Sequence, residues 1–140
     1  MKLEQIKKIR DDWVAALRSG EYTQGRKTLY RGPVDSEHEV PATYCCLGVL
    51  AAQSGVSETE LADLHYLDDL NIPGVAALET AADALGQLIP LDALKPDGTI
   101  MTVNWDHKLF AELNDSQGKT FADIADILEK MDLSTTPPEN

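Results

Sequence analysis

The sequence predicts a mainly α-helical domain of the α+β class, a compact bundle of about five or six helices with a short β-hairpin near residues 27–44. Three observations support this fold class. Apolar residues recur every three or four positions near both ends of the chain. An uncharged run of small and apolar residues, Tyr44–Ala52, lies between them, and a short run with strand character precedes it. We therefore expect the flanking helices to bury this central segment.

The length of the chain fits one domain. A chain of 140 residues can bury roughly two-thirds of the surface that its unfolded state exposes. We expect this domain to span residues 1–133 and the polar, proline-containing tail at 134–140 to be disordered. No stretch has the length of a membrane span or the pattern of a signal peptide, so we expect a cytoplasmic protein.

Both ends of the domain are predicted to be amphipathic helices. The first is expected to end at Gly20, and the last to begin after Thr120, with Asp123 in the capping-box position. The apolar stripe of the first helix comprises Leu3, Ile6, Ile9, Trp13, Val14 and Leu17. That of the last helix comprises Phe121, Ile124, Ile127 and Leu128.

The central segment is expected to follow the second arm of the hairpin. Residues 27–31 and 40–44 are predicted to pair, because Gly32-Pro33 and a polar loop separate them. A buried helix should then run from Cys45 to Gln53. A glycine inside a helix costs about 1 kcal/mol, so Gly48 predicts that another backbone approaches this helix closely.

The remaining chain is predicted to be helical with two interruptions. Ser57 and Glu60 form the capping box of a helix expected to continue to about Leu70. The elements predicted after it are a helix at 75–88, a short strand at 100–103, a helix at 105–113 capped by Asn104, and a turn at 114–119.

The distribution of charge points to the kind of partner that the protein binds. The net charge is -12, and residues 32–94 contain 11 acidic residues and no lysine or arginine. Such a field repels nucleic acid and favours basic protein surfaces, including those that normally hold DNA or RNA. The expected partner-binding residues are Glu58, Glu60, Asp63, Tyr66, Asp68, Asp69, Glu79 and Asp83, with Tyr66 as an apolar anchor.

A cysteine-dependent hydrolase is the enzymatic alternative. Cys45 and Cys46 lie at the start of a predicted helix, where the helix dipole favours a thiolate. The other groups of a papain-like site are present as His107 for the base, Asn114 or Asp115 to orient it, and Gln24 as an oxyanion donor. The local sequence signature of that class is missing, so we assign no catalytic residue and interpret both thiols as small core side chains.

No metal site or cofactor is expected from the sequence. His38, His65 and His107 are scattered, and the chain has no Cys-x-x-Cys motif. No glycine-rich phosphate loop follows a predicted strand. The last helix invites comparison with the first half of a helix-turn-helix, but no basic recognition helix follows it, so direct nucleic-acid binding is not expected.

Three segments of the chain resemble a family of small uncharacterised proteins found in bacteriophages, prophages and some bacteria. The segments are WVAALRSGEYTQG at 13–25, YCCLGVL at 44–50, and LND at 113–115 followed by GKTFADIADILE at 118–129. The resemblance implies a phage-type accessory protein and supplies no catalytic residues. In this module we expect the central segment to pack between the first and last helices, and Asn114 and Asp115 to cap free backbone donors at a helix N-terminus.

The resemblance and the charge together predict a non-enzymatic host-takeover or anti-defence protein. It would inhibit a bacterial protein with a basic surface, such as a CRISPR effector or a restriction nuclease. The alternative is a small-ligand-binding protein, for example a sponge for nucleotide signals, with a pocket near Arg26, Lys27 and Arg31.

Overall fold

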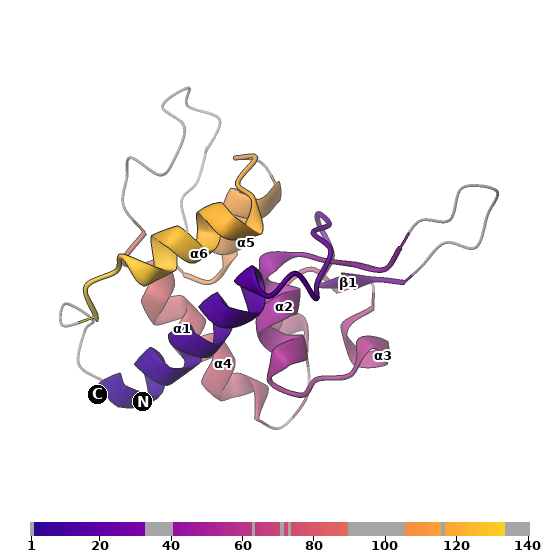
Figure 1. Cartoon of the computed structure of the whole chain (residues 1–140). Helices are drawn as coiled ribbons and strands as arrows, with labels where there is room; N and C mark the ends of the chain where they lie inside the picture. Colours follow the sequence, from indigo (N-terminus) through magenta and orange to yellow (C-terminus); the bar gives the residue numbers. More distant parts are fainter. Residues whose placement is uncertain are drawn as a thin grey trace.

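Helices make up most of the described structure, which confirms the predicted mainly α fold with a small β-hairpin. The computed structural model describes residues 2–32, 41–62, 64–70, 72, 74–89, 106–115 and 117–133. Figure 1 shows the first helix lying across the middle of the molecule, with the last helix alongside it. The described elements are α1 (Leu3–Arg18), β1 (Tyr30–Arg31), β2 (Thr43–Tyr44), α2 (Cys46–Gln53), α3 (Glu58–Leu61), the 3-10 turn η1 (Leu67–Asp69), α4 (Val75–Gly86), α5 (Lys108–Asp115) and α6 (Phe121–Glu129).

Helix α1 is the element against which α2, α4 and α6 pack. It covers the predicted span, and Gly20 follows its end with a positive φ of 77°. Trp13 is fully buried, donates its indole N–H to Cys46 O at 2.9 Å, and meets the edge of Phe110 at 4.8 Å between ring centroids. One aromatic side chain therefore joins α1 to both α2 and α5.

Helix α6 closes on α1 through polar as well as apolar contacts. Arg10 is buried in α1 and donates from Nη1 to Leu128 O at 3.0 Å. Arg18 pairs with Asp126 at 2.7 Å and with Glu129. The predicted capping box of α6 is confirmed, since Thr120 Oγ1 accepts from Asp123 N at 3.1 Å and Asp123 Oδ2 accepts from Thr120 N at 3.0 Å.

Helix α2 is the predicted central helix, with Cys45 as its N-cap residue. It packs chiefly on α1 and α5 rather than between the first and last helices. This corrects the expected arrangement, and the reason is that the apolar face of α6 is covered by α1 and α5. The close approach predicted at Gly48 is confirmed, because a Cβ there would lie 1.7 Å from Leu29 O.

The hairpin forms with short arms. Strands β1 and β2 pair antiparallel, with Tyr30 opposite Tyr44 and Arg31 opposite Thr43. Gln24 adds an isolated parallel bridge to Tyr44. The polar loop predicted between the arms, including His38, falls on residues 33–40, outside the described residues.

The prediction of one continuous helix from Ser57 to about Leu70 is wrong. The capping box at Ser57 and Glu60 forms, but α3 ends at Leu61 and the backbone becomes extended at Ala62. There Ala62 bridges Tyr30, and Leu64 O accepts from Leu29 N at 2.6 Å. Backbone groups that a longer helix would have used are bonded to the segment around β1 instead, so tertiary pairing overrides a pattern of leucines at helical spacing.

The start and end of α5 also differ from the prediction. The helix begins at Lys108, and two carboxylates accept the backbone amides at this point. Asp83 Oδ1 accepts from His107 N, just before the helix, and Asp106 Oδ1 accepts from Lys108 N, each at 2.9 Å. It ends at Asp115, so Asn114 and Asp115 belong to the helix rather than to a turn. The predicted cap Asn104, the strand at 100–103 and the tail at 134–140 lie outside the described residues.

Within the described part of the chain, every helix is too short or too polar to cross a lipid bilayer.

Replacing Gly48 with alanine tests the close packing of α2. By helix propensity alone the substitution would stabilise by about 1 kcal/mol. We expect it instead to lower the free energy of unfolding by roughly 1–3 kcal/mol, because the added methyl meets the Leu29 carbonyl. Urea denaturation followed by circular dichroism measures the change.

Gly32→Ala is the matched control for that substitution. Among the described residues, a Cβ at Gly32 would lie 3.9 Å from Cε2 and from the hydroxyl of Tyr30, so this variant should unfold at nearly the wild-type urea concentration. A stabilised Gly48→Ala protein would show that Leu29 can withdraw from α2.

Candidate functional site

A buried carboxamide joins the three segments on which the family resemblance depends. Asn114 is fully buried, and its Oδ1 accepts from Cys46 N at 3.2 Å and from Gln24 Nε2 at 2.9 Å. Its Nδ2 donates to Gly25 O and Asp115 Oδ1, both at 2.8 Å. Asn114 therefore satisfies a free amide at the N-terminus of α2, a capping role of the kind predicted for it but at a different helix.

Gln24 extends this network to the last helix. Its Oε1 accepts from Phe121 N at 3.1 Å, and its Nε2 also donates to Lys119 O at 2.8 Å. Asp115 Oδ1 accepts from Lys27 N at 2.9 Å. Gln24, Asn114 and Asp115 thus hold four chain segments together, and each named polar atom has a protein partner.

Asn114→Ala tests whether this network stabilises the fold. The change leaves Cys46 N and Gly25 O without their side-chain partners, so we expect the free energy of unfolding to fall by about 2–4 kcal/mol. Gln87→Ala, at an exposed position after α4, should change it by less than about 0.5 kcal/mol. Urea denaturation of both variants decides the point, and equal midpoints would contradict a stabilising role for Asn114.

The two thiols lie in the core beside this network. Cys45 and Cys46 are 1% and 0% exposed. Burial raises the pKa of the Cys45 thiol to about 11 and also raises that of Cys46. Cys46 Sγ lies 3.3 Å from Phe110 O, to which it donates. Burial thus outweighs the helix N-terminus and keeps both thiols protonated at neutral pH.

The other groups proposed for a thiol site are directed elsewhere. His107 hydrogen-bonds to Asp83 and lies beside Tyr66, while Gln24 and Asn114 bond to each other. The structure therefore brings Asn114 to the backbone of Cys46. Among the described residues, the side chain of His107 contacts carboxylates and an aromatic ring.

Thiol alkylation provides a direct check of this arrangement. Because the thiolate is the reactive form, a raised pKa predicts slow reaction of the folded protein with iodoacetamide at pH 7.5. Both cysteines should react promptly in urea, which serves as the control. Mass spectrometry counts the added groups, and rapid alkylation of the native protein would contradict the inferred burial.

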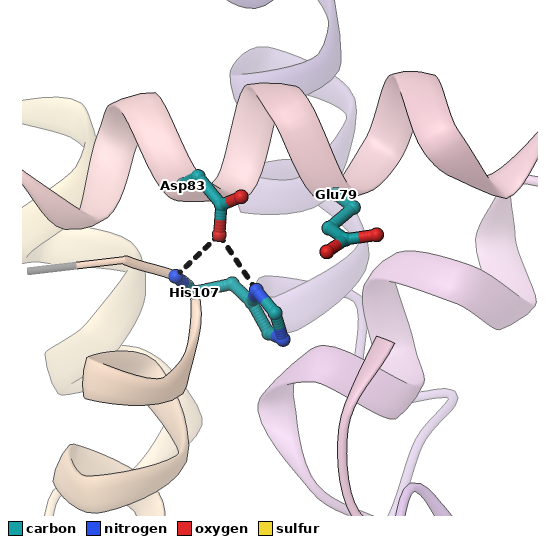
Figure 2. Close-up of side chains that lie close together, drawn as sticks. All are labelled: Glu79, Asp83 and His107. Atoms are coloured by element: carbon teal, nitrogen blue, oxygen red, sulfur yellow. Dashed lines mark hydrogen bonds and ion pairs between the residues drawn. The ribbon is translucent and has the colours of Figure 1, made fainter. Parts of the chain in front are cut away.

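His107 forms the centre of a second polar cluster, on the acidic part of the molecule. Glu79 and Asp83 are one turn apart on α4, and His107 comes from the residues just before α5 (Figure 2). Asp83 Oδ1 lies 2.6 Å from His107 Nδ1 and 2.9 Å from the backbone N of the same residue. One potential ligand atom from each of Glu79, Asp83 and His107 lies within 4.8 Å of the others.

Asp68 of η1 approaches the same histidine from its other ring nitrogen. Asp68 Oδ1 is 3.5 Å from His107 Nε2, and Asp68 Oδ2 is 3.7 Å from Lys108 Nζ. Nε2 itself is buried and makes no hydrogen bond to any residue that the structure describes. We call Asp68, Glu79, Asp83 and His107 the His107 cluster. Its geometry suits a histidine that holds a proton or a cation between carboxylates.

The other predicted partner-binding residues lie on neighbouring elements. Glu58 accepts from the Tyr44 hydroxyl at 3.0 Å and lies 3.4 Å from that of Tyr30; burial and this carboxylate both raise the pKa of Tyr44. Asp69 Oδ2 accepts from Tyr66 N at 3.0 Å, so it orders η1. Tyr66 is 36% exposed, with Lys108 Nζ 5.2 Å from its ring centroid. Asp63 lies outside the described residues.

A groove of about 370 Å³ connects α3 with the start of α4. Glu60 lines it together with Val75 and Leu78. The basic residues of the predicted ligand pocket do not line this groove. Arg26, Lys27 and Arg31 are exposed, and Lys27 is fixed through its backbone rather than its charge. Binding of a nucleotide signal near them stays a prediction.

Every member of the His107 cluster is a candidate residue in the sequence, but no sequence pattern predicts that these residues meet. Glu79 and Asp83 are four residues apart in a predicted helix, and this spacing indicates that both lie on one face of it. The position of His107 beside them depends on the segment before α5, which returns to α4 so closely that a Cβ at Gly86 would lie 2.2 Å from Asp106 O. Lys108, which pairs with Asp68, was missed entirely.

Fold and site together define a small, mainly helical domain with a buried polar network and an acidic surface that contains one histidine-centred cluster. Residues 5–132 match the model of a family described as a domain of unknown function (DUF8296), and the chain belongs to that family. Comparisons with curated proteins and with solved structures give no match.

Proposed function

We propose that the protein is a non-enzymatic binding protein that docks its acidic surface onto a basic surface of a bacterial protein. The observation that carries this proposal is the exposed Tyr66 ring beside Asp68 and Asp69, in a region without lysine or arginine from residue 32 to residue 94. Exposed aromatic side chains next to carboxylates are typical anchors of interfaces that use electrostatic steering. One cation also lies here, since Lys108 Nζ is 5.2 Å from the centroid of the Tyr66 ring. In this proposal the partner is the bacterial protein that is inhibited, and binding takes place in the bacterial cytoplasm.

The local contacts leave this surface strongly negative. Glu58 and Asp69 accept hydrogen bonds from neutral donors, so their charges are not neutralised by those bonds. Lys108 is a described cation at this surface, and its Nζ is 3.7 Å from Asp68. A surface of this kind resembles the charge pattern of a nucleic acid, which supports a CRISPR effector or a nuclease as the partner class.

Charge removal without loss of hydrogen-bond acceptors tests the proposal. The triple variant Glu58→Gln/Glu60→Gln/Asp69→Asn keeps an acceptor oxygen at each position. We expect the tagged wild-type protein to capture a nucleic-acid-binding protein from a bacterial lysate, and the captured protein to be released by salt or by added duplex DNA. The triple variant should retain at least tenfold less of it, measured by quantitative mass spectrometry.

A variant with the same loss of charge elsewhere is the control. Glu4→Gln/Asp12→Asn/Glu21→Gln changes three exposed residues in α1 and the segment after it, and should capture as much partner as the wild type. Equal capture by both triple variants would show that the acidic residues around Tyr66 do not form the interface. Capture that resists competing DNA would argue against a nucleic-acid-binding channel as the target.

A further inference from the structure

One ring nitrogen at the centre of the His107 cluster lacks a hydrogen-bond partner among the described residues, although Asp68 Oδ1 lies 3.5 Å from it. The side chain of His107 is 3% exposed, and its Nε2 is buried and makes no hydrogen bond to any described residue. A buried polar atom without a partner costs about 1–3 kcal/mol, so natural proteins rarely leave one unless something binds it. The carboxylates near this nitrogen indicate which kind of group binds it.

The hydrogen bonds on the other side of the ring fix its tautomer. Asp83 Oδ1 accepts from His107 N, and it lies 2.6 Å from Nδ1, a distance that requires a proton between them. In the neutral ring the proton is therefore on Nδ1, and Nε2 has a free lone pair. Metal-binding histidines are held in this way, with the ring nitrogen that does not bind the metal donating to a carboxylate.

The lone pair of Nε2 faces negative charge. Asp68 Oδ1 is 3.5 Å away, and the Glu79 carboxylate lies on the side of α4 that faces the ring (Figure 2). Two ligand atoms bound at about 2.1 Å to a tetrahedral ion are about 3.4 Å apart, which matches the separation of Nε2 and Oδ1. In a ring that has its only proton on Nδ1, this arrangement places the Nε2 lone pair 3.5 Å from the Asp68 carboxylate unless a cation lies between them.

The charge of the cluster gives the valence of that cation. Asp68, Glu79 and Asp83 contribute three negative charges when ionised, and Lys108 contributes one positive charge at the outer oxygen of Asp68. Metal binding through Nε2 requires the singly protonated ring, which leaves two negative charges to be balanced by the ion. Lys108 pairs with Oδ2 and leaves Oδ1 directed toward the ring.

We propose that the His107 cluster binds one divalent transition-metal ion. His107 Nε2, Asp68 and Glu79 are its ligands, and Asp83 orients the imidazole. Binding draws the Asp68 and Glu79 side chains together, because the potential ligand atoms that already lie within 4.8 Å of one another are those of Glu79, Asp83 and His107. One imidazole with carboxylates suits Zn²⁺ or Mn²⁺, whereas Mg²⁺ and Ca²⁺ prefer oxygen ligands alone. The absence of a metal site expected from the sequence rested on the scattered histidines, and this cluster uses only one of them.

Titration calorimetry of the full chain provides the test. The protein is treated with a chelator, dialysed, and titrated with ZnCl₂, MnCl₂ or MgCl₂ at pH 7.5. We expect saturable binding of one Zn²⁺ or Mn²⁺ ion per chain and at least tenfold weaker binding of Mg²⁺. His107→Asn keeps a donor where Nδ1 lies and removes Nε2, so it should weaken Zn²⁺ or Mn²⁺ binding by about 100-fold or more.

A second ligand variant and a charge control make the result specific. Glu79→Gln should weaken the same ion by at least tenfold, whereas Glu60→Gln removes an equal charge from α3 and should leave the affinity unchanged. Circular dichroism of each variant confirms that it folds. If His107→Asn is unfolded, Glu79→Gln and Asp68→Asn decide the question by the same measurement.

Three outcomes would overturn the metal site. They are no saturable binding of Zn²⁺ or Mn²⁺, equal loss of affinity in Glu60→Gln and Glu79→Gln, and a nitrogen NMR spectrum showing His107 doubly protonated at pH 7.5 in the metal-treated protein. In the last case a proton alone satisfies Nε2. None of these measurements involves the protein partner, so the metal site and the proposed function can fail separately.

Discussion

The fold depends on the satisfaction of one buried carboxamide. Asn114 is fully enclosed, and its two polar atoms bond to α2, to the loop after α1 and to its own helix. A buried amide side chain is costly unless it is fully paired, and once paired it tolerates few alternative arrangements. The registry of α2 against α5 and the position of Gln24 beneath α6 both follow from this requirement. Hydrophobic contact alone would permit these helices to slide against one another.

The two clusters that contain reactive residue types differ in how many of their polar atoms are hydrogen-bonded. Around Asn114 each named polar atom has a protein partner, and the thiols beside it are protonated and inaccessible. Around His107 the described carboxylates outnumber the described cations, and Nε2 makes no hydrogen bond to a described residue. The polar atoms of the first cluster are therefore satisfied within the protein, whereas the second cluster has a ring nitrogen that can accept a ligand. Function is therefore better sought at the surface between η1, α4 and α5 than at the cysteines.

Local signals predicted the fold well where they were not opposed by distant pairing. The apolar stripes of α1 and α6, the cap at Thr120 and the glycine at position 48 all act within a few residues, or through the absence of a side chain. The helix predicted to reach Leu70 failed because Ala62 and Leu64 bond to residues 29–30, and no local pattern records that competition. The His107 cluster likewise depends on contacts between distant parts of the chain. Its carboxylates were identified by charge, but their meeting with His107 depends on tertiary structure.

The pairing of α1 with α6 has a consequence for the synthesis of this protein. Arg10 and Leu128, which bond to each other, are separated by 118 positions in the chain. On the ribosome α1 therefore emerges well before α6, and the part of α1 that packs on α6 remains available to other apolar surfaces during that interval. Contacts between the ends of a chain slow folding, because they are made only after the intervening segment has been ordered. A nascent chain that has not reached α6 is therefore a natural substrate for a chaperone.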